Sequence, residues 1–132
     1  MKGRIAPMGL LRVECKLENP SDRTRIAVVP SVLVDTGAEL SWMPKDVLER
    51  IGVGRESKKV RFRMADGAAI TRDVGYAIIR HDKFKTIDEV VFGEPGDLSL
   101  LGARTLEGMN VKVDPTNKRL VAAGPIIAAA SA

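Results

Sequence analysis

The heptapeptide VLVDTGA, at residues 32–38, places a carboxylate directly after an apolar run. Such a run, ending in a glycine-containing turn, is typical of a buried strand followed by a tight loop. Gly37 allows positive φ and a close approach of the loop backbone to a partner. Thr36 adds a hydroxyl that can tie the loop to a neighbouring carbonyl. Residues 35–38 alone also fit an ordinary β-turn, so the rest of the chain must distinguish a site from a turn.

Outward from this heptapeptide, the sequence predicts further short elements on both sides. Before residue 53 we expect strands over residues 8–17 and 25–34, an extended piece over 39–43 and a helix over 45–51. Turn-forming residues at 19–22 separate the first two strands. Pro44 suits the first turn of the helix, and Gly52 suits its C-terminal end.

The second half of the chain reads as β-structure with one more helical turn. We expect strands over residues 59–65, 68–80, 84–92 and 98–101, a helical turn over 103–106, and a terminal hairpin of residues 110–113 and 119–121. Asp66-Gly67 between the first two of these strands is a strong signal for a two-residue hairpin turn. Many short strands with one or two small helices favour an all-β fold, a closed or nearly closed β-barrel.

Composition limits the classes of protein that the chain can form. A length of 132 residues fits one domain, which we expect over residues 1–124, followed by a flexible tail over 125–132. The content of 45% hydrophobic and 4% aromatic residues predicts an aliphatic core. No apolar stretch is long enough to cross a membrane. The single cysteine, Cys15, cannot form an internal disulfide, so we expect a packing role for it and a cytoplasmic location.

The net charge of +4 is mild, and its densest basic stretch lies at residues 55–63. A basic stripe could bind nucleic acid. In this stretch, however, apolar Val60 and Phe62 alternate with basic residues, and stacking aromatic residues do not interleave with the charges. We therefore interpret it as the solvated face of a strand and expect no nucleic-acid partner.

Several other chemistries lack the residues that they need. His81 is the only histidine, so a Ser-His-Asp triad or a histidine-rich metal site would lack its second histidine. The sequence shows no phosphate-binding glycine loop, and we expect neither a metal nor a cofactor. We interpret His81 and Asp114 as turn residues and Trp42 as part of the core or of a pocket wall.

Four segments in order give the heptapeptide a context. They are residues 33–38 (LVDTGA), 39–44 (ELSWMP), 65–67 (ADG) and 100–106 (LLGARTL). With these segments the chain resembles the retropepsins, the family of retroviral and retroviral-like aspartic peptidases, and most closely their compact bacterial single-domain members. The resemblance covers about residues 8–121. It implies the closed acid-protease barrel for the fold.

The resemblance also assigns roles to individual residues. It implies that Asp35 is catalytic and that Thr36 and Gly37 support its loop. It implies substrate-binding positions at Ala38, Glu39, Ala65, Asp66, Gly67 and Ala68, the last four in a hairpin that covers the substrate as a flap. The arginine near the C-terminus of the family's pattern falls one place later here, at Arg104, so the sequence does not predict that it pairs with Glu39.

Hydrolysis of a peptide by this route needs two carboxyl groups, one to take a proton from water and one to polarise the amide carbonyl. The chain has one Asp-Thr-Gly, so the second aspartate must come from another copy, and a two-fold homodimer is the simplest arrangement. We therefore expect an aspartic endopeptidase that acts on extended, largely apolar peptides. The alternative is a dimeric peptide-binding or scaffold module of the same fold with weak or no turnover.

Overall fold

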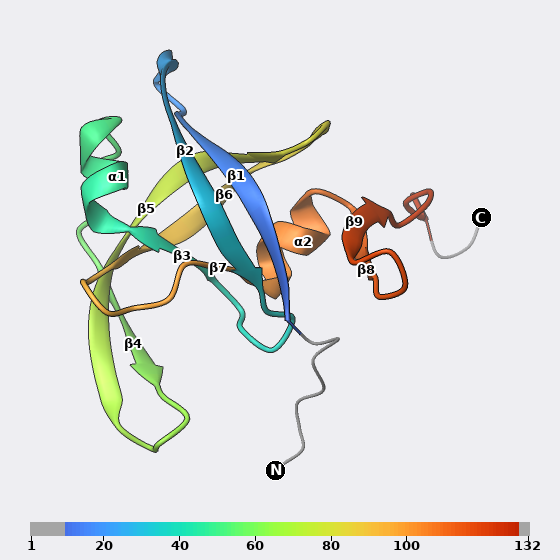
Figure 1. Cartoon of the computed structure of the whole chain (residues 1–132). Coiled ribbons are helices and arrows are strands. Elements are labelled where there is room, and N and C mark those ends of the chain that lie inside the picture. Colours follow the sequence, from blue (N-terminus) through green and yellow to red (C-terminus); the bar gives the residue numbers. More distant parts are fainter. Residues whose placement is uncertain (1–9, 130–132) are drawn as a thin grey trace.

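The computed structural model describes residues 10–129, and Figure 1 shows a mostly β protein with two short helices. The elements in chain order are β1 (Leu11–Asn19), β2 (Asp22–Val34), β3 (Ser41–Pro44), α1 (Lys45–Arg50), β4 (Lys59–Arg63), β5 (Ala69–His81), β6 (Phe84–Gly93), β7 (Leu100–Leu101), α2 (Ala103–Gly108), β8 (Val111–Asp114) and β9 (Arg119–Ala122). All the elements expected from the sequence are present, with shifted ends. The start of the expected first strand, at residue 8, lies outside the described residues. The same holds for the first nine residues of the expected domain and the last three of the expected tail.

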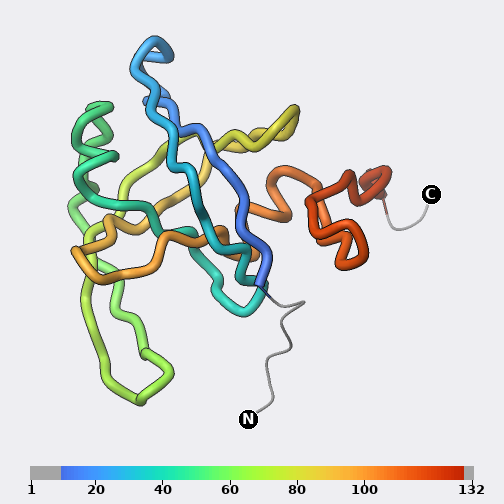
Figure 2. The backbone as a smooth tube through the Cα atoms, viewed as in Figure 1, coloured from blue at the N-terminus to red at the C-terminus, as the bar shows by residue number. Residues whose placement is uncertain are grey.

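Seven strands form one mixed sheet in the order β1-β2-β7-β3-β6-β5-β4. The sheet returns on itself because β1 also pairs with β5, through residues 16–18 and 78–80. The β2–β7 and β3–β6 pairs are parallel, and the other pairs are antiparallel. In Figure 2 the β1–β2 ribbon crosses the β5–β6 ribbon, where this pairing occurs. The result is a ring-like sheet, with β4 left at an edge.

The aliphatic core lies on the inner face of this ring. Along β1 the odd-numbered side chains from Leu11 to Leu17 are buried and the even-numbered ones from Arg12 to Lys16 are exposed, as the period of two of a strand requires. Cys15 belongs to this core, and burial, with a smaller effect of the Glu14 charge, raises the pKa of its thiol to about 12. It is a packing residue, as predicted.

A second apolar cluster lies beside the β4–β5 hairpin. Its buried members are Leu40, Trp42, Val74 and Val91, and the half-buried Val60, Phe62, Ile70 and Leu100 pack against them. The rings of Trp42 and Phe62 lie 4.8 Å apart between centroids, tilted by 53°. Because half of this cluster is only partly covered, it forms an apolar wall open to solvent on one side.

The turn of the β4–β5 hairpin is longer than the sequence predicted. Strand pairing stops at Arg63 and Ala69, Met64 N donates to Ala68 O (2.8 Å), and Gly67 N donates to Met64 O (2.9 Å). Gly67 has φ +89°, a conformation that favours glycine. His81, expected in the next turn, instead ends β5 and pairs with Phe84, with its Nδ1 2.8 Å from Glu14 O.

Outside the ring, β8 and β9 form a separate hairpin that follows α2, at the right of Figure 1. Asp114 at its turn accepts hydrogen bonds from the backbone of Thr116 and Asn117, which confirms its role as a turn residue. The two helices have six residues each, and no helix in residues 10–129 is long and apolar enough to cross a membrane.

Candidate active site

The carboxylate of the heptapeptide lies at the end of β2, where β7 holds the strand. Val34 of β2 pairs with Leu101, and Asp35 N donates to Leu101 O (2.9 Å). The loop then folds back on its own aspartate, because Gly37 N donates to Asp35 Oδ1 (3.0 Å) and Ala38 N to Asp35 O (3.2 Å). Backbone bonds thus fix the chain on both sides of Asp35, and the Gly37 N–H orients its half-buried side chain.

Gly102 lets α2 sit directly against this loop. A Cβ at residue 102 would lie 2.6 Å from Leu40 O and 2.8 Å from Glu39 O, closer than real Cβ atoms approach. The absence of a side chain allows Ala103 N to donate to Ala38 O (2.7 Å) and Arg104 N to Glu39 O (3.1 Å). This gives a physical reason for the glycine in the segment at residues 100–106.

A buried polar network behind the loop was not predicted from the sequence. Ser41 Oγ and Thr105 Oγ1 lie 2.5 Å apart, Gly102 N donates to Ser41 Oγ (3.0 Å), and Thr105 Oγ1 donates to Asp88 Oδ2 (2.8 Å). Since Thr105 uses its one hydroxyl proton on the carboxylate, Ser41 is the donor to Thr105. The network joins β3, α2 and β6. Its members are far apart in the chain, and no local pattern connects them.

A groove of about 730 Å³ lies between the Asp35 loop and the β4–β5 hairpin. Of the site residues predicted from the sequence, Asp35, Gly37, Ala38, Glu39 and Ala65 line it. Thr36, Asp66, Gly67 and Ala68 are exposed and are not part of its lining. Its volume is within the range of ligand-binding pockets.

The apolar wall of the groove was largely missed. The members of the second apolar cluster that line the groove are Leu40, Trp42, Val60, Phe62 and Leu100, and Met64 and Leu98 extend this wall. Trp42 was predicted as a core or pocket-wall residue and is both, since it is buried and lines the groove. The alternation of apolar side chains along residues 60–64 was the signal that could have found Val60, Phe62 and Met64, whereas no such signal marks Leu40, Leu98 and Leu100.

Two of the three carboxylates that line the groove are paired with arginines. Asp97 receives two hydrogen bonds from Arg72, of 2.7 and 3.1 Å, which lower its pKa. Glu39 receives two from Arg104, of 2.7 and 3.0 Å, which raise the pKa of the guanidinium. Within residues 10–129, Asp35 is the groove carboxylate that has no ion-pair partner.

The pairing of Glu39 with Arg104 is a contact that the sequence left open. The arginine falls one place later than in the family pattern, but its backbone N is bonded to Glu39 O (3.1 Å). The first turn of α2 therefore carries its side chain to the same acid.

Comparison with known families agrees with this geometry. The model of the family described as gag-polyprotein putative aspartyl protease matches residues 29–108. The chain belongs to this retropepsin-like family. The matched range includes the Asp35 loop, the β4–β5 hairpin and α2. A search of curated proteins found no match for the chain.

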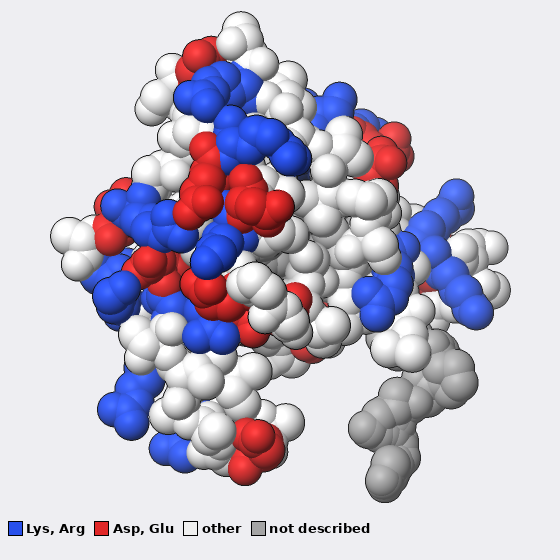
Figure 3. Space-filling model, turned by 60° about the vertical axis from the view of Figure 1, so that its left-hand side comes forward, with Lys and Arg blue, Asp and Glu red and all other residues white. Residues whose placement is uncertain are grey.

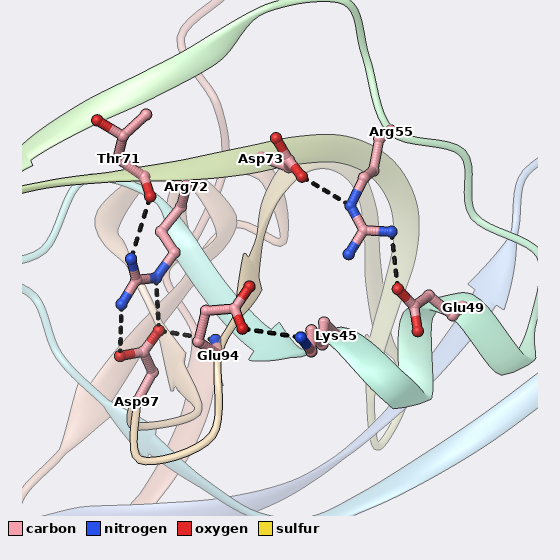
Figure 4. A network of polar contacts seen from close by, with 8 residues as sticks. All are labelled: Lys45, Glu49, Arg55, Thr71, Arg72, Asp73, Glu94 and Asp97. Atoms are coloured by element: carbon pink, nitrogen blue, oxygen red, sulfur yellow. Dashed lines mark hydrogen bonds and ion pairs between the residues drawn. The ribbon is translucent and has the colours of Figure 1, made fainter.

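In this aspartyl protease family member, further ion pairs fix the groove from the outside. Figure 4 shows Arg72 on Asp97, Lys45 on Glu94, and Arg55 between Glu49 and Asp73. Glu94 N also donates to Asp97 Oδ2 (2.8 Å). The Arg72 and Lys45 contacts attach the loop between β6 and β7 to β5 and to α1, and Arg55 joins α1 to β5.

The same pairs bear on the basic stretch at residues 55–63. Arg55, Lys58 and Lys59 each contact a carboxylate, on Glu49, Asp73 or Glu89. In β4 the basic residues are exposed and Val60 and Phe62 are half-buried, as expected for a solvated strand face. Figure 3 shows basic and acidic side chains interspersed over this side of the molecule. A mixed surface of this kind gives little support to a nucleic-acid interface.

Proposed function

We propose that the chain is an aspartic endopeptidase that works as a homodimer, with Asp35 of each copy at a shared site. The observation that carries this proposal is the groove. It brings Asp35, a carboxylate without an ion-pair partner within residues 10–129, to an apolar wall beneath a β-hairpin. Membership of the aspartyl protease family supports the reaction class.

The second carboxylate has to come from outside the described chain. Glu39 and Asp97, the other acids of the groove, already neutralise Arg104 and Arg72. A two-fold axis beside the Asp35 loop would bring the same residue of a second copy to the first, which is an isologous contact. Two such carboxyl groups, about 3 Å apart, share one proton and titrate as a coupled pair.

This pair would supply both catalytic groups at once. The ionised carboxylate takes a proton from the attacking water, and the protonated carboxyl donates a hydrogen bond to the peptide carbonyl. The proton then passes to the leaving amine. No metal or cofactor is needed for these steps.

The remaining residues take supporting roles in this proposal. Thr36 and Gly37 hold the loop at the dimer axis, and Ala38 and Glu39 contact the substrate backbone. The hairpin acts as a flap, with Ala65, Asp66, Gly67 and Ala68 at its tip closing over an extended peptide in a strand-addition mode. In this proposal the ring-like sheet serves as the closed retropepsin barrel of a domain over residues 1–124.

Asp35→Asn tests the proposal, because it removes the ionisable group and keeps the shape. We expect loss of peptide cleavage with an unchanged thermal unfolding midpoint. Asp82→Asn is the matched control, since Asp82 lies in the exposed β5–β6 turn with φ +54°, which asparagine also tolerates. Full cleavage activity in purified Asp35→Asn protein would refute the proposal.

The scaffold alternative predicts a different binding preference. A working pair of aspartates prefers tetrahedral geometry, so a statine-containing peptide should bind at least 100-fold more tightly than the matching plain peptide. Equal affinity for the two peptides, measured by calorimetry, would indicate a binding module without turnover.

A further inference from the structure

We propose that Glu89 is a positioning residue that couples the flap to the active-site loop. This inference rests on the proposed peptidase function. Glu89 lies in β6, outside the sequence motifs and outside the lining of the groove. It nevertheless contacts cations from both sides of the groove.

The first of these cations belongs to the active-site side. Arg104 Nη1 donates to Glu89 Oε1 (3.4 Å) while the same guanidinium binds Glu39 Oε2 at 2.7 Å through Nη2. One arginine is therefore shared between an exposed acid at the groove and a buried acid behind it. Since the guanidinium is planar and rigid, a shift at one acid changes the geometry at the other.

The second cation belongs to the flap side. Lys58 Nζ lies 2.8 Å from Glu89 Oε2, and Lys58 directly precedes β4, the first strand of the flap. The interaction with Glu89 raises the pKa of Lys58. The charges thus alternate in a row from Glu39 through Arg104 and Glu89 to Lys58, which joins the two sides of the groove.

The state of the Glu89 carboxylate favours a functional role over a purely structural one. Its side chain is 9% exposed, and its two partners are more exposed cations: Lys58 Nζ at 2.8 Å from Oε2 and Arg104 Nη1 at a long 3.4 Å from Oε1. Burying a carboxylate is costly, and here it depends on two cations whose side chains are about half exposed, an arrangement that calls for an explanation. The explanation we infer is that the row from Glu39 to Lys58 shortens its contacts when the flap closes on a peptide.

By contrast, the other buried acid on the outer face of the sheet is fully held. Glu18 receives hydrogen bonds from Arg23 and Arg80, and these outweigh the effect of its burial, so that its pKa is lowered. Glu18 lies on β1, away from the flap, and its two arginines satisfy it. This difference singles out Glu89, and not Glu18, as the buried acid that couples the flap to the active-site loop.

Glu89→Gln keeps the size of the side chain and removes its charge. In the free protein we expect the amides of residues 59–73 to exchange with deuterium faster than in the wild type, by about 2- to 30-fold, the range of such couplings. The KM for a peptide, or the Kd of a statine-containing peptide, should rise by a similar factor, with a smaller change in kcat. Glu89→Asp, which restores the charge, should recover part of the loss.

Lys58→Met tests the flap end alone, and its exposed position avoids a folding defect. It should change exchange in residues 59–73 in the same direction as Glu89→Gln. Lys112→Met, the same change on the exposed face of β8, should leave that exchange unchanged. Wild-type exchange in both Glu89→Gln and Lys58→Met would overturn the coupling.

The two proposals fail separately. If the wild type cleaves peptides and both variants keep its KM and its exchange rates, the coupling is wrong and the peptidase function stands. If the wild type cleaves no peptide but both variants exchange faster over residues 59–73, the coupling stands and the peptidase function falls.

Discussion

The Asp35 loop and the β4–β5 hairpin face each other across one groove, but they are held in opposite ways. The loop is bonded through its backbone to β7 and to α2, with the buried Ser41–Thr105 network behind it. The hairpin has its β4 strand at a sheet edge and an exposed tip of residues 64–68. Few buried contacts and exposed backbone bonds mark a region of low local stability. One side of the groove is therefore preorganised, and the other is able to adapt to a peptide.

Gly102→Ala should produce the largest effect, because it breaks the rigid side. The new Cβ would meet the backbone oxygens of residues 39 and 40, which cannot move aside as a flexible side chain would. We expect a loss of about 1–3 kcal/mol in the free energy of unfolding, with activity reduced further because the Asp35 loop shifts. Urea denaturation measures the first effect.

Gly54→Ala is the control for this substitution. An added Cβ at residue 54 meets no atom within 4 Å, so the stability should stay close to that of the wild type. Equal stability of Gly102→Ala and Gly54→Ala would show that α2 does not hold the loop as described.

Gly67→Ala should have a smaller effect on the adaptable side. The residue has φ +89° but open space around it, so the substitution adds backbone strain without a steric clash. We expect a loss of about 1 kcal/mol, confined to the hairpin and visible as faster amide exchange in residues 59–73. A uniform loss of protection over the whole sheet would show that the hairpin is not a separate unit.

Protonation of a single carboxylate at low pH should reduce the free energy of unfolding least of all these changes. Hydrogen bonds from Arg72 lower the pKa of Asp97, and those from Lys59 lower the pKa of Asp73. A lowered pKa in the folded state means that the stabilisation is present above the ordinary value of 3.8 and is lost as pH falls below it. The urea midpoint should therefore decline below about pH 4, and less steeply in Asp97→Asn. A constant midpoint from pH 6 to 2.5 would contradict this.

Sequence reasoning recovered the strands and helices because alternation, Pro44 and Gly52 are local signals. The family resemblance also placed Asp35, Ala38 and Glu39 at one site, and these residues line one groove. Sequence reasoning missed contacts between elements far apart in the chain, such as that of Ser41 in β3 with Thr105 in α2. Residue spacing in the chain carries no information on distances across a sheet.

The same limit explains the Arg104 result. The sequence shows the arginine displaced by one place, and only the packing of α2 against the loop shows that it still reaches Glu39. Asp66, Gly67 and Ala68 illustrate the reverse case. Asp66-Gly67 is itself a clear turn signal in the sequence, yet these three residues are not part of the groove lining.

The stoichiometry of inhibitor binding tests the shared site most directly. Calorimetric titration with a statine-containing peptide should give one peptide bound per two chains, and sedimentation should show a dimer. The Asp35→Asn protein should no longer bind this peptide. One peptide bound to each single chain, with no dimer at any protein concentration, would contradict the account.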